Sequence, residues 1–99
     1  MITVNEVCKL LDETEKFLKA KLEGTVDETT KKDLASRIVE FEKSCIEIGL
    51  DDYEPDTAED IADYLINDSH RFFRWLENKG LDFADEVRYK AIEQEKATE

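Results

Sequence analysis

The chain has 99 residues, of which 40% are hydrophobic and 40% are charged, and its formal net charge is −12 at pH 7. This length predicts one domain over residues 1–99. Three Gly and one Pro provide few of the turns that an all-β fold needs, so we expect the domain to be helical. The negative charge argues against direct binding to nucleic acid or to an anionic membrane. The sequence contains no run of about 18 apolar residues, so we expect no transmembrane helix.

The first residues lack the basic start and apolar segment of a secretory signal. Two cysteines without such a signal favour a reducing compartment. We therefore expect a cytoplasmic protein with reduced thiols.

The first predicted helix covers residues 3–23. Thr3 and Glu6 have the spacing of a capping box at its start, and Gly24 suits a left-handed cap after its end. Apolar residues at helical spacing predict one inward stripe, with Leu10 and Phe17 at its edge. The stripe consists of Val4, Val7, Cys8, Leu11, Leu18 and Leu22.

The second predicted helix covers residues 27–48, starts at Thr25 or Asp27 and ends at Gly49. Its inward seam consists of Leu34, Ile38, Phe41, Cys45 and Ile48. Val39 and Ile46 form a second, narrower stripe. Two apolar flanks indicate two neighbours, either within the bundle or across a homodimer.

The residues after Gly49 form a connection, because Pro55 disfavours a helical conformation at Glu54. Asp56 or Thr57 can then cap a third helix over residues 57–79. The triplet "NDS" at 67–69 is unfavourable for a helix, but the apolar stripe stays in phase across it, so we predict one continuous helix. Tyr64 and Trp75 lie at the margin of this stripe. Gly80 is expected to end the helix.

A short fourth helix is predicted over residues 82–95, with a frayed tail at 94–99. Short connections between these segments predict an all-α fold, a small four-helix bundle built on an antiparallel helical hairpin. The first two helices form this hairpin.

No group of residues typical of an enzyme stands out. His70 is the single histidine, and its neighbours in a helix point away from it, so they form no triad with it. A glycine-rich phosphate loop is also missing. We expect no catalytic residue and no cofactor.

Two groups of residues, the cysteines and the acids after Asp51, partly resemble metal-binding sites. Cys8 and Cys45 fall on facing positions of the hairpin, but four ligands at zinc spacing are lacking. We expect buried reduced thiols, and whether the two pair stays open. The acids between Asp52 and Asp63 imitate a calcium loop, but Thr57 replaces its essential Gly. We therefore expect no metal site.

Residues 44–69 carry nine acids and no base, so −9 of the net charge of −12 lies in this segment. Solubility and the positive dipole at helix starts explain part of this excess. Glu47 lies near the C-terminus of the second helix, where the dipole disfavours an acid, and Asp51, Asp52 and Glu54 share one loop with no cation to screen them. In the third helix, like charges at i, i+4 cost about 0.2–0.5 kcal/mol per pair. Such repulsion favours an external cationic partner.

A helix rises about 1.5 Å per residue, so an acidic helical face approaches the charge density of a nucleic-acid strand. We predict a non-enzymatic acidic inhibitor of the DNA-mimic type, which occupies the basic nucleic-acid-binding surface of a partner protein. Phage anti-restriction, anti-CRISPR and polymerase-inhibiting proteins exemplify this class. Tyr53 is the expected anchor. The predicted contacts are Glu47, Asp51, Asp52, Tyr53, Glu54, Asp56, Glu59, Asp60 and Asp63.

Two alternatives remain at this point. One alternative is an immunity protein or antitoxin that neutralises a basic nuclease toxin, a function that requires the same acidic surface. A different class is a homodimeric assembly protein without mimicry, paired through Val39 and Ile46.

Overall fold

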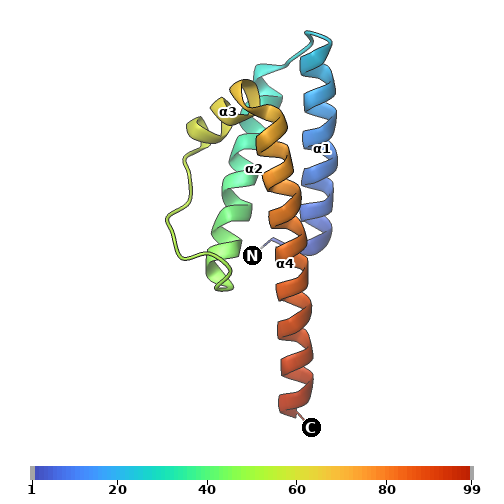
Figure 1. Cartoon of the computed structure of the whole chain (residues 1–99), viewed down its shortest axis with the longest axis vertical. Coiled ribbons are helices and arrows are strands. Elements are labelled where there is room, and N and C mark those ends of the chain that lie inside the picture. Colours follow the sequence, from blue (N-terminus) through green and yellow to red (C-terminus); the bar gives the residue numbers. More distant parts are fainter. Residues whose placement is uncertain (1, 99) are drawn as a thin grey trace.

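The chain folds into four α-helices. The computed structural model describes the backbone of residues 2–98 and the side chains of residues 2–93. The helices are α1 (Val4–Leu22), α2 (Glu28–Glu47), α3 (Ala58–Asn67) and α4 (Ser69–Thr98). α1 and α2 form an antiparallel hairpin, α4 lies along α1, and α3 packs on α2 (Figure 1). The predicted all-α fold with four helices is confirmed.

Local signals position the first three helix starts as the sequence predicts. In each case a side chain outside the helix accepts a 3.2 Å hydrogen bond from a backbone amide of the first turn: Thr3 from Glu6, Asp27 from Thr29 and Thr57 from Asp60. Gly24 and Gly49 follow the ends of α1 and α2 with φ of 76° and 82°, a left-handed conformation that favours glycine.

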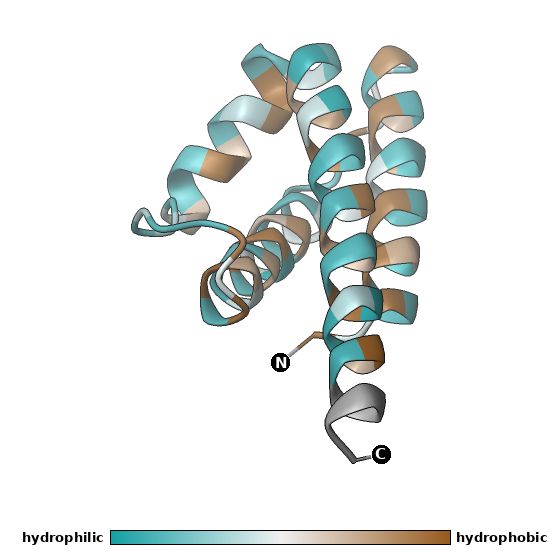
Figure 2. Cartoon of the chain, turned by 60° about the horizontal axis from the view of Figure 1, so that its bottom comes forward, coloured by the Kyte–Doolittle hydropathy of each residue, from teal (hydrophilic) through white to brown (hydrophobic). Residues whose placement is uncertain are grey.

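The core lies where the helices meet, and each helix turns a hydrophobic side inward (Figure 2). Phe41 of α2 and Phe83 of α4 are fully buried, and their rings meet edge to face with centroids 5.5 Å apart. The other fully buried apolar side chains among the described residues are Leu10, Leu34, Ala35, Ile38, Cys45, Ile61, Leu65 and Leu76. A core contributed by all four helices fixes where the surface residues lie.

The inward side of α1 is rotated from the predicted stripe. Leu10 and Phe17, expected at its edge, are buried, whereas Leu22 is 89% exposed. The reason is that α1 contacts both α2 and α4, so its buried side is centred between them. Cys8 is consequently exposed and Cys45 is buried, and both are free thiols. The prediction of a buried thiol is therefore right for Cys45 and wrong for Cys8.

The predicted continuous helix over residues 57–79 is wrong. The chain breaks at Asp68 (φ −140°, ψ 39°), which ends α3 and precedes α4. The short polar side chains of Asn67, Asp68 and Ser69 can hydrogen-bond to the nearby backbone and so compete with helical hydrogen bonds. A lysine of α1 also stabilises the break. There the Lys21 ammonium donates to the carbonyl of Ile66 and, at 3.0 Å, to the hydroxyl of Ser69.

The prediction that Gly80 ends a helix is wrong. The residue lies buried within α4. A Cβ atom at this position would be 3.3 Å from side-chain atoms of Val7 and Leu11. Glycine therefore allows the close approach of α4 to α1, and α4 runs unbroken to Thr98. The predicted helix over residues 82–95 is thus the C-terminal part of α4, and the predicted fraying of residues 94–99 stays a prediction.

In the part of the chain that the structure describes, no helix has both the length and the apolar character needed to span a bilayer.

Candidate functional site

Most of the predicted contact residues lie on one edge of the molecule. Residues 48–57 connect α2 to α3, and this connecting loop and α3 together form the edge opposite α1 (Figure 1). The loop is largely hydrophilic (Figure 2). The edge therefore brings the acids of residues 51–63 together in space as well as in sequence.

Asp51 is the exception among the loop acids, because its side chain is only 8% exposed. Its carboxylate pairs with the ammonium of Lys79, with 2.6 Å between Oδ1 and Nζ. The expectation that no cation screens this residue is wrong, since α4 brings Lys79 to the loop from 28 positions away in sequence. Asp51 thus ties the loop to α4.

Glu42 makes a second attachment, which the sequence interpretation missed. Its side chain is buried in α2, and Oε2 accepts a 2.9 Å hydrogen bond from the backbone amide of Asp56. Burial raises the pKa of Glu42 to about 7; the amide hydrogen bond opposes this shift, and the charges of Asp56 and Asp51 add to it. The available signal was the position of Glu42 on the helical stripe that contains Val39.

Tyr53 and Cys45 adjoin these carboxylates. Burial, followed by the charge of Asp51, raises the pKa of each group to about 12, so neither ionises at neutral pH. The Tyr53 ring is 44% exposed, and the Lys79 nitrogen lies 6.0 Å from its centroid. Tyr53, the predicted anchor, is thus positioned on one side by the loop attachments and open to solvent on the other.

The other acids of this edge point outward. They are Asp52, Glu54, Asp56, Glu59, Asp60, Asp63 and Asp68, and we refer to them as the acidic face; Asp56 is half-buried and the others are exposed. The ion pairs found among the described side chains include none of these carboxylates. Lys31 and Lys32 share a surface hollow with Glu59 and Asp63 without forming a pair. The acidic face is therefore largely unneutralised.

Glu47 lies apart from the acidic face. It is the last residue of α2 and lines a hollow between α1 and α2 that also contains Lys9, Arg37 and Lys43. Glu6 and Glu40 line the same hollow, and Arg37 and Lys43 pair with other carboxylates, so no ion pair among the described side chains includes Glu47. Glu47 therefore lies away from the acidic face, and its predicted contact with a partner stays a prediction.

Beside the acidic face, between the loop, α3 and α4, lies an open groove of about 370 Å³. We refer to it as the aromatic groove, and it is lined by Tyr53, Asp56, Tyr64, Asp68, Arg71, Phe72 and Trp75. Phe72 stacks between Tyr64 and Trp75, with centroid distances of 5.6 and 5.4 Å. The two residues at the margin of the predicted stripe therefore belong to one continuous aromatic surface.

The second stripe of α2 has neighbours within the chain. Val39 and Ile46 share a helical flank with Ala35, which faces α3, and with Glu42, which bonds to the loop. Val39 packs against the core, and Ile46 is half-buried. Contact with α3 and the loop accounts for the two apolar flanks of α2.

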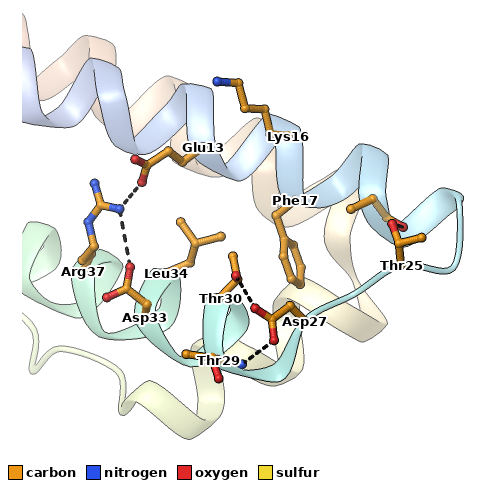
Figure 3. A pocket seen from close by; sticks show the side chains of 11 residues that line it. Glu13, Lys16, Phe17, Thr25, Asp27, Thr29, Thr30, Asp33, Leu34 and Arg37 are labelled. Carbon is orange, nitrogen blue, oxygen red and sulfur yellow. Dashed lines mark hydrogen bonds and ion pairs between the residues drawn. The ribbon is translucent and has the colours of Figure 1, made fainter.

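Six of the nine acids of α1 and α2 are paired with cations, in contrast to the acidic face. Arg37 lies between Glu13 of α1 and Asp33 of α2, 3.7 Å from the carboxylate of Asp33 (Figure 3). The remaining hairpin pairs are Asp12–Lys16, Glu15–Lys19, Glu28–Lys31 and Glu40–Lys43. Charge is thus balanced locally along α1 and α2.

Among the described residues, no group of three or more His, Cys, Asp or Glu side chains is arranged to hold a metal ion. The chain matches no protein-family model and has no significant match among curated proteins or solved structures. Its function is therefore inferred from its own residues.

Proposed function

We propose that this protein is a non-enzymatic inhibitor that docks its acidic face on the basic nucleic-acid-binding surface of a partner protein. The partner's cations would replace those that the acidic face lacks within the chain. Bound in this way, the protein excludes DNA or RNA by occupying the same surface.

The observation that carries the proposal is the difference in ion pairing between two parts of one small molecule. Six of the nine carboxylates of α1 and α2 have Lys or Arg partners, whereas those of the acidic face have none among the described side chains. Unneutralised charges repel one another, and a complementary basic surface relieves that repulsion. Such a face also accelerates encounter with a cationic partner at low salt.

The buried carboxylates support the proposal by positioning the loop. Asp51 attaches it to Lys79, and Glu42 holds the Asp56 amide. The exposed acids of the loop are thereby held on a defined backbone before binding, which lowers the ordering cost of association. Asp51 itself acts within the chain, so the proposed direct contacts begin at Asp52.

A capture experiment with matched variants tests the proposal. The face variant changes four exposed acids to amides: Asp52→Asn, Glu54→Gln, Asp60→Asn and Asp63→Asn. The control variant makes the same change of charge on the hairpin: Asp12→Asn, Glu15→Gln, Asp33→Asn and Glu40→Gln. The eight side chains are exposed, so both variants should fold, and circular dichroism checks this.

The immobilised wild type should retain nucleic-acid-binding proteins from a host lysate and release them when duplex DNA or RNA is added. The control variant should retain the same proteins, and the face variant should lose them. Equal retention by both variants, or retention that nucleic acid does not displace, would exclude the proposal. The activity of the released partner decides between an inhibitor of nucleic-acid machinery and an immunity protein against a nuclease.

A further inference from the structure

We propose that the aromatic groove receives an arginine side chain from the basic partner. This inference rests on the proposed function, since it assigns the acidic face a specific cationic contact. The groove lies beside the acidic face and shares Asp56 and Asp68 with it. It would add a defined anchoring point to an otherwise diffuse charge attraction.

The aromatic surface presents ring faces to an incoming group. Tyr64 is 42% exposed and Tyr53 is 44% exposed, and Trp75 is half-buried between α4 and the loop. Phe72, only 7% exposed, stacks at interplanar angles of 25° and 26° with Tyr64 and Trp75 and so holds both rings in place. A planar group can stack on such rings without rearrangement of the backbone.

The chain already places one of its own cations against these rings. The Lys79 nitrogen lies 5.9 Å from the Trp75 centroid and 6.0 Å from the Tyr53 centroid, within the range of a cation–π interaction. The Lys79 ammonium is held by Asp51. Trp75 already contacts Phe72 and Lys79, so a second cation is expected at the more exposed rings of Tyr53 and Tyr64.

The charges around the groove favour a cation. Asp56 and Asp68 line it, and Asp52 and Glu54 belong to the same loop as Tyr53. Arg71 also lines the groove, and its positive charge would repel a cation. A substitution of Arg71 therefore tests whether the occupant is positively or negatively charged.

Arginine fits these features better than lysine. Its guanidinium is planar, stacks on aromatic faces and is weakly hydrated, and it can donate to two carboxylate oxygens at once. A volume of about 370 Å³ lies at the lower end of the range for ligand pockets, which suits one side chain. The occupant is therefore assigned as a single arginine of a basic segment.

Trp75 is the single tryptophan of the chain, so its fluorescence reports on the groove directly. The test is a titration at low salt with three capped peptides: tetra-arginine, tetra-lysine and tetra-citrulline, the last being a neutral analogue of arginine. We expect a saturable change with tetra-arginine, weaker binding of tetra-lysine and no response to tetra-citrulline. Equal responses to arginine and citrulline would assign the groove to a neutral group and overturn the inference.

Variants separate the groove from the rest of the acidic face. Tyr64→Leu should weaken tetra-arginine binding about two- to fivefold, whereas Tyr89→Leu, at an exposed tyrosine of α4 outside the groove, should not. Asp56→Asn with Asp68→Asn should weaken it on the order of fivefold, and Arg71→Gln should strengthen it about twofold. Weaker binding by Arg71→Gln would indicate an anionic occupant and contradict the assignment.

The two proposals fail differently. If the face variant abolishes partner capture but Tyr64→Leu and the Asp56/Asp68 variant leave peptide binding unchanged, the acidic face stands and the groove assignment is wrong. If peptide binding depends on the groove but partner capture does not depend on the acidic face, the proposed inhibitory function is wrong and the arginine site stands.

Discussion

The hairpin and the edge formed by the connecting loop and α3 handle negative charge in opposite ways. On α1 and α2, six of the nine acids have cations at i+3 or i+4 or across the hairpin, and six of the seven ion pairs among the described side chains lie there. At the edge, the one paired carboxylate is that of Asp51, which is buried. The difference indicates that the negative surface arises because residues 44–69 contain no Lys or Arg, so their acids have no cation nearby in sequence.

A second difference lies between the acids inside and outside the edge. Glu42 and Asp51 are buried and attach the loop, whereas the acidic face is open to solvent. The inner carboxylates stabilise a conformation, and the outer ones are free to meet a partner. Changes at the two sets should therefore affect different measurements, stability for the inner set and binding for the outer set.

The largest change in the free energy of unfolding is expected for a substitution in the core that both regions share. Phe41→Ala removes a fully buried ring and its contact with Phe83, and should lower the free energy of unfolding by about 3–5 kcal/mol. Tyr53→Ala, at a half-exposed ring of the loop, should cost clearly less. Urea unfolding monitored by circular dichroism measures both, and equal costs would show that the loop is as much a part of the core as α2.

The next effect compares a buried ion pair with an exposed one. Lys79→Met leaves the Asp51 carboxylate buried without its cation and should cost about 3 kcal/mol of unfolding free energy. Lys16→Met breaks the exposed pair with Asp12 and should cost less than about 0.5 kcal/mol. The same unfolding measurement applies, and a similar small cost for both would mean that the loop is not held by this pair.

A smaller, pH-dependent effect is expected at Glu42. Its folded-state pKa of about 7 exceeds the ordinary 4.5, so the folded protein binds this proton more tightly, and stability falls as the pH rises from 4.5 through 7. Glu42→Gln removes the charge and should raise the unfolding free energy by about 1–3 kcal/mol near pH 8, with little change near pH 5. Glu40→Gln, at an exposed position of α2, is the control. A pH-independent difference would contradict the assigned burial of this charge.

The helix starts could be predicted because their signals are local. Thr3, Asp27 and Thr57 bond to amides two or three residues away, and Gly24 and Gly49 act through their own backbone conformation. The exposed acids were predictable for the same reason, since a segment without bases has no i+4 partner to offer.

The remaining features depend on contacts between distant residues. The break at Asp68 involves Lys21 of α1, and the continuation of α4 through Gly80 depends on Val7 and Leu11. Periodicity could not reveal the break, because α3 and α4 bury residues at spacings that remain in phase. Lys79 meets Asp51 across 28 positions of sequence, a contact that helical periodicity does not reveal.

The central claim is that the unpaired acids of the loop and α3 bind cations in preference to the paired acids of the hairpin. The most direct measurement is a titration of the ¹⁵N-labelled chain with capped tetra-arginine, with every backbone amide followed by NMR. Chemical-shift changes should concentrate on residues 52–68 and the groove side of α4, and should disappear as salt is added. Changes of equal size along α1 and the hairpin side of α2 would contradict the claim.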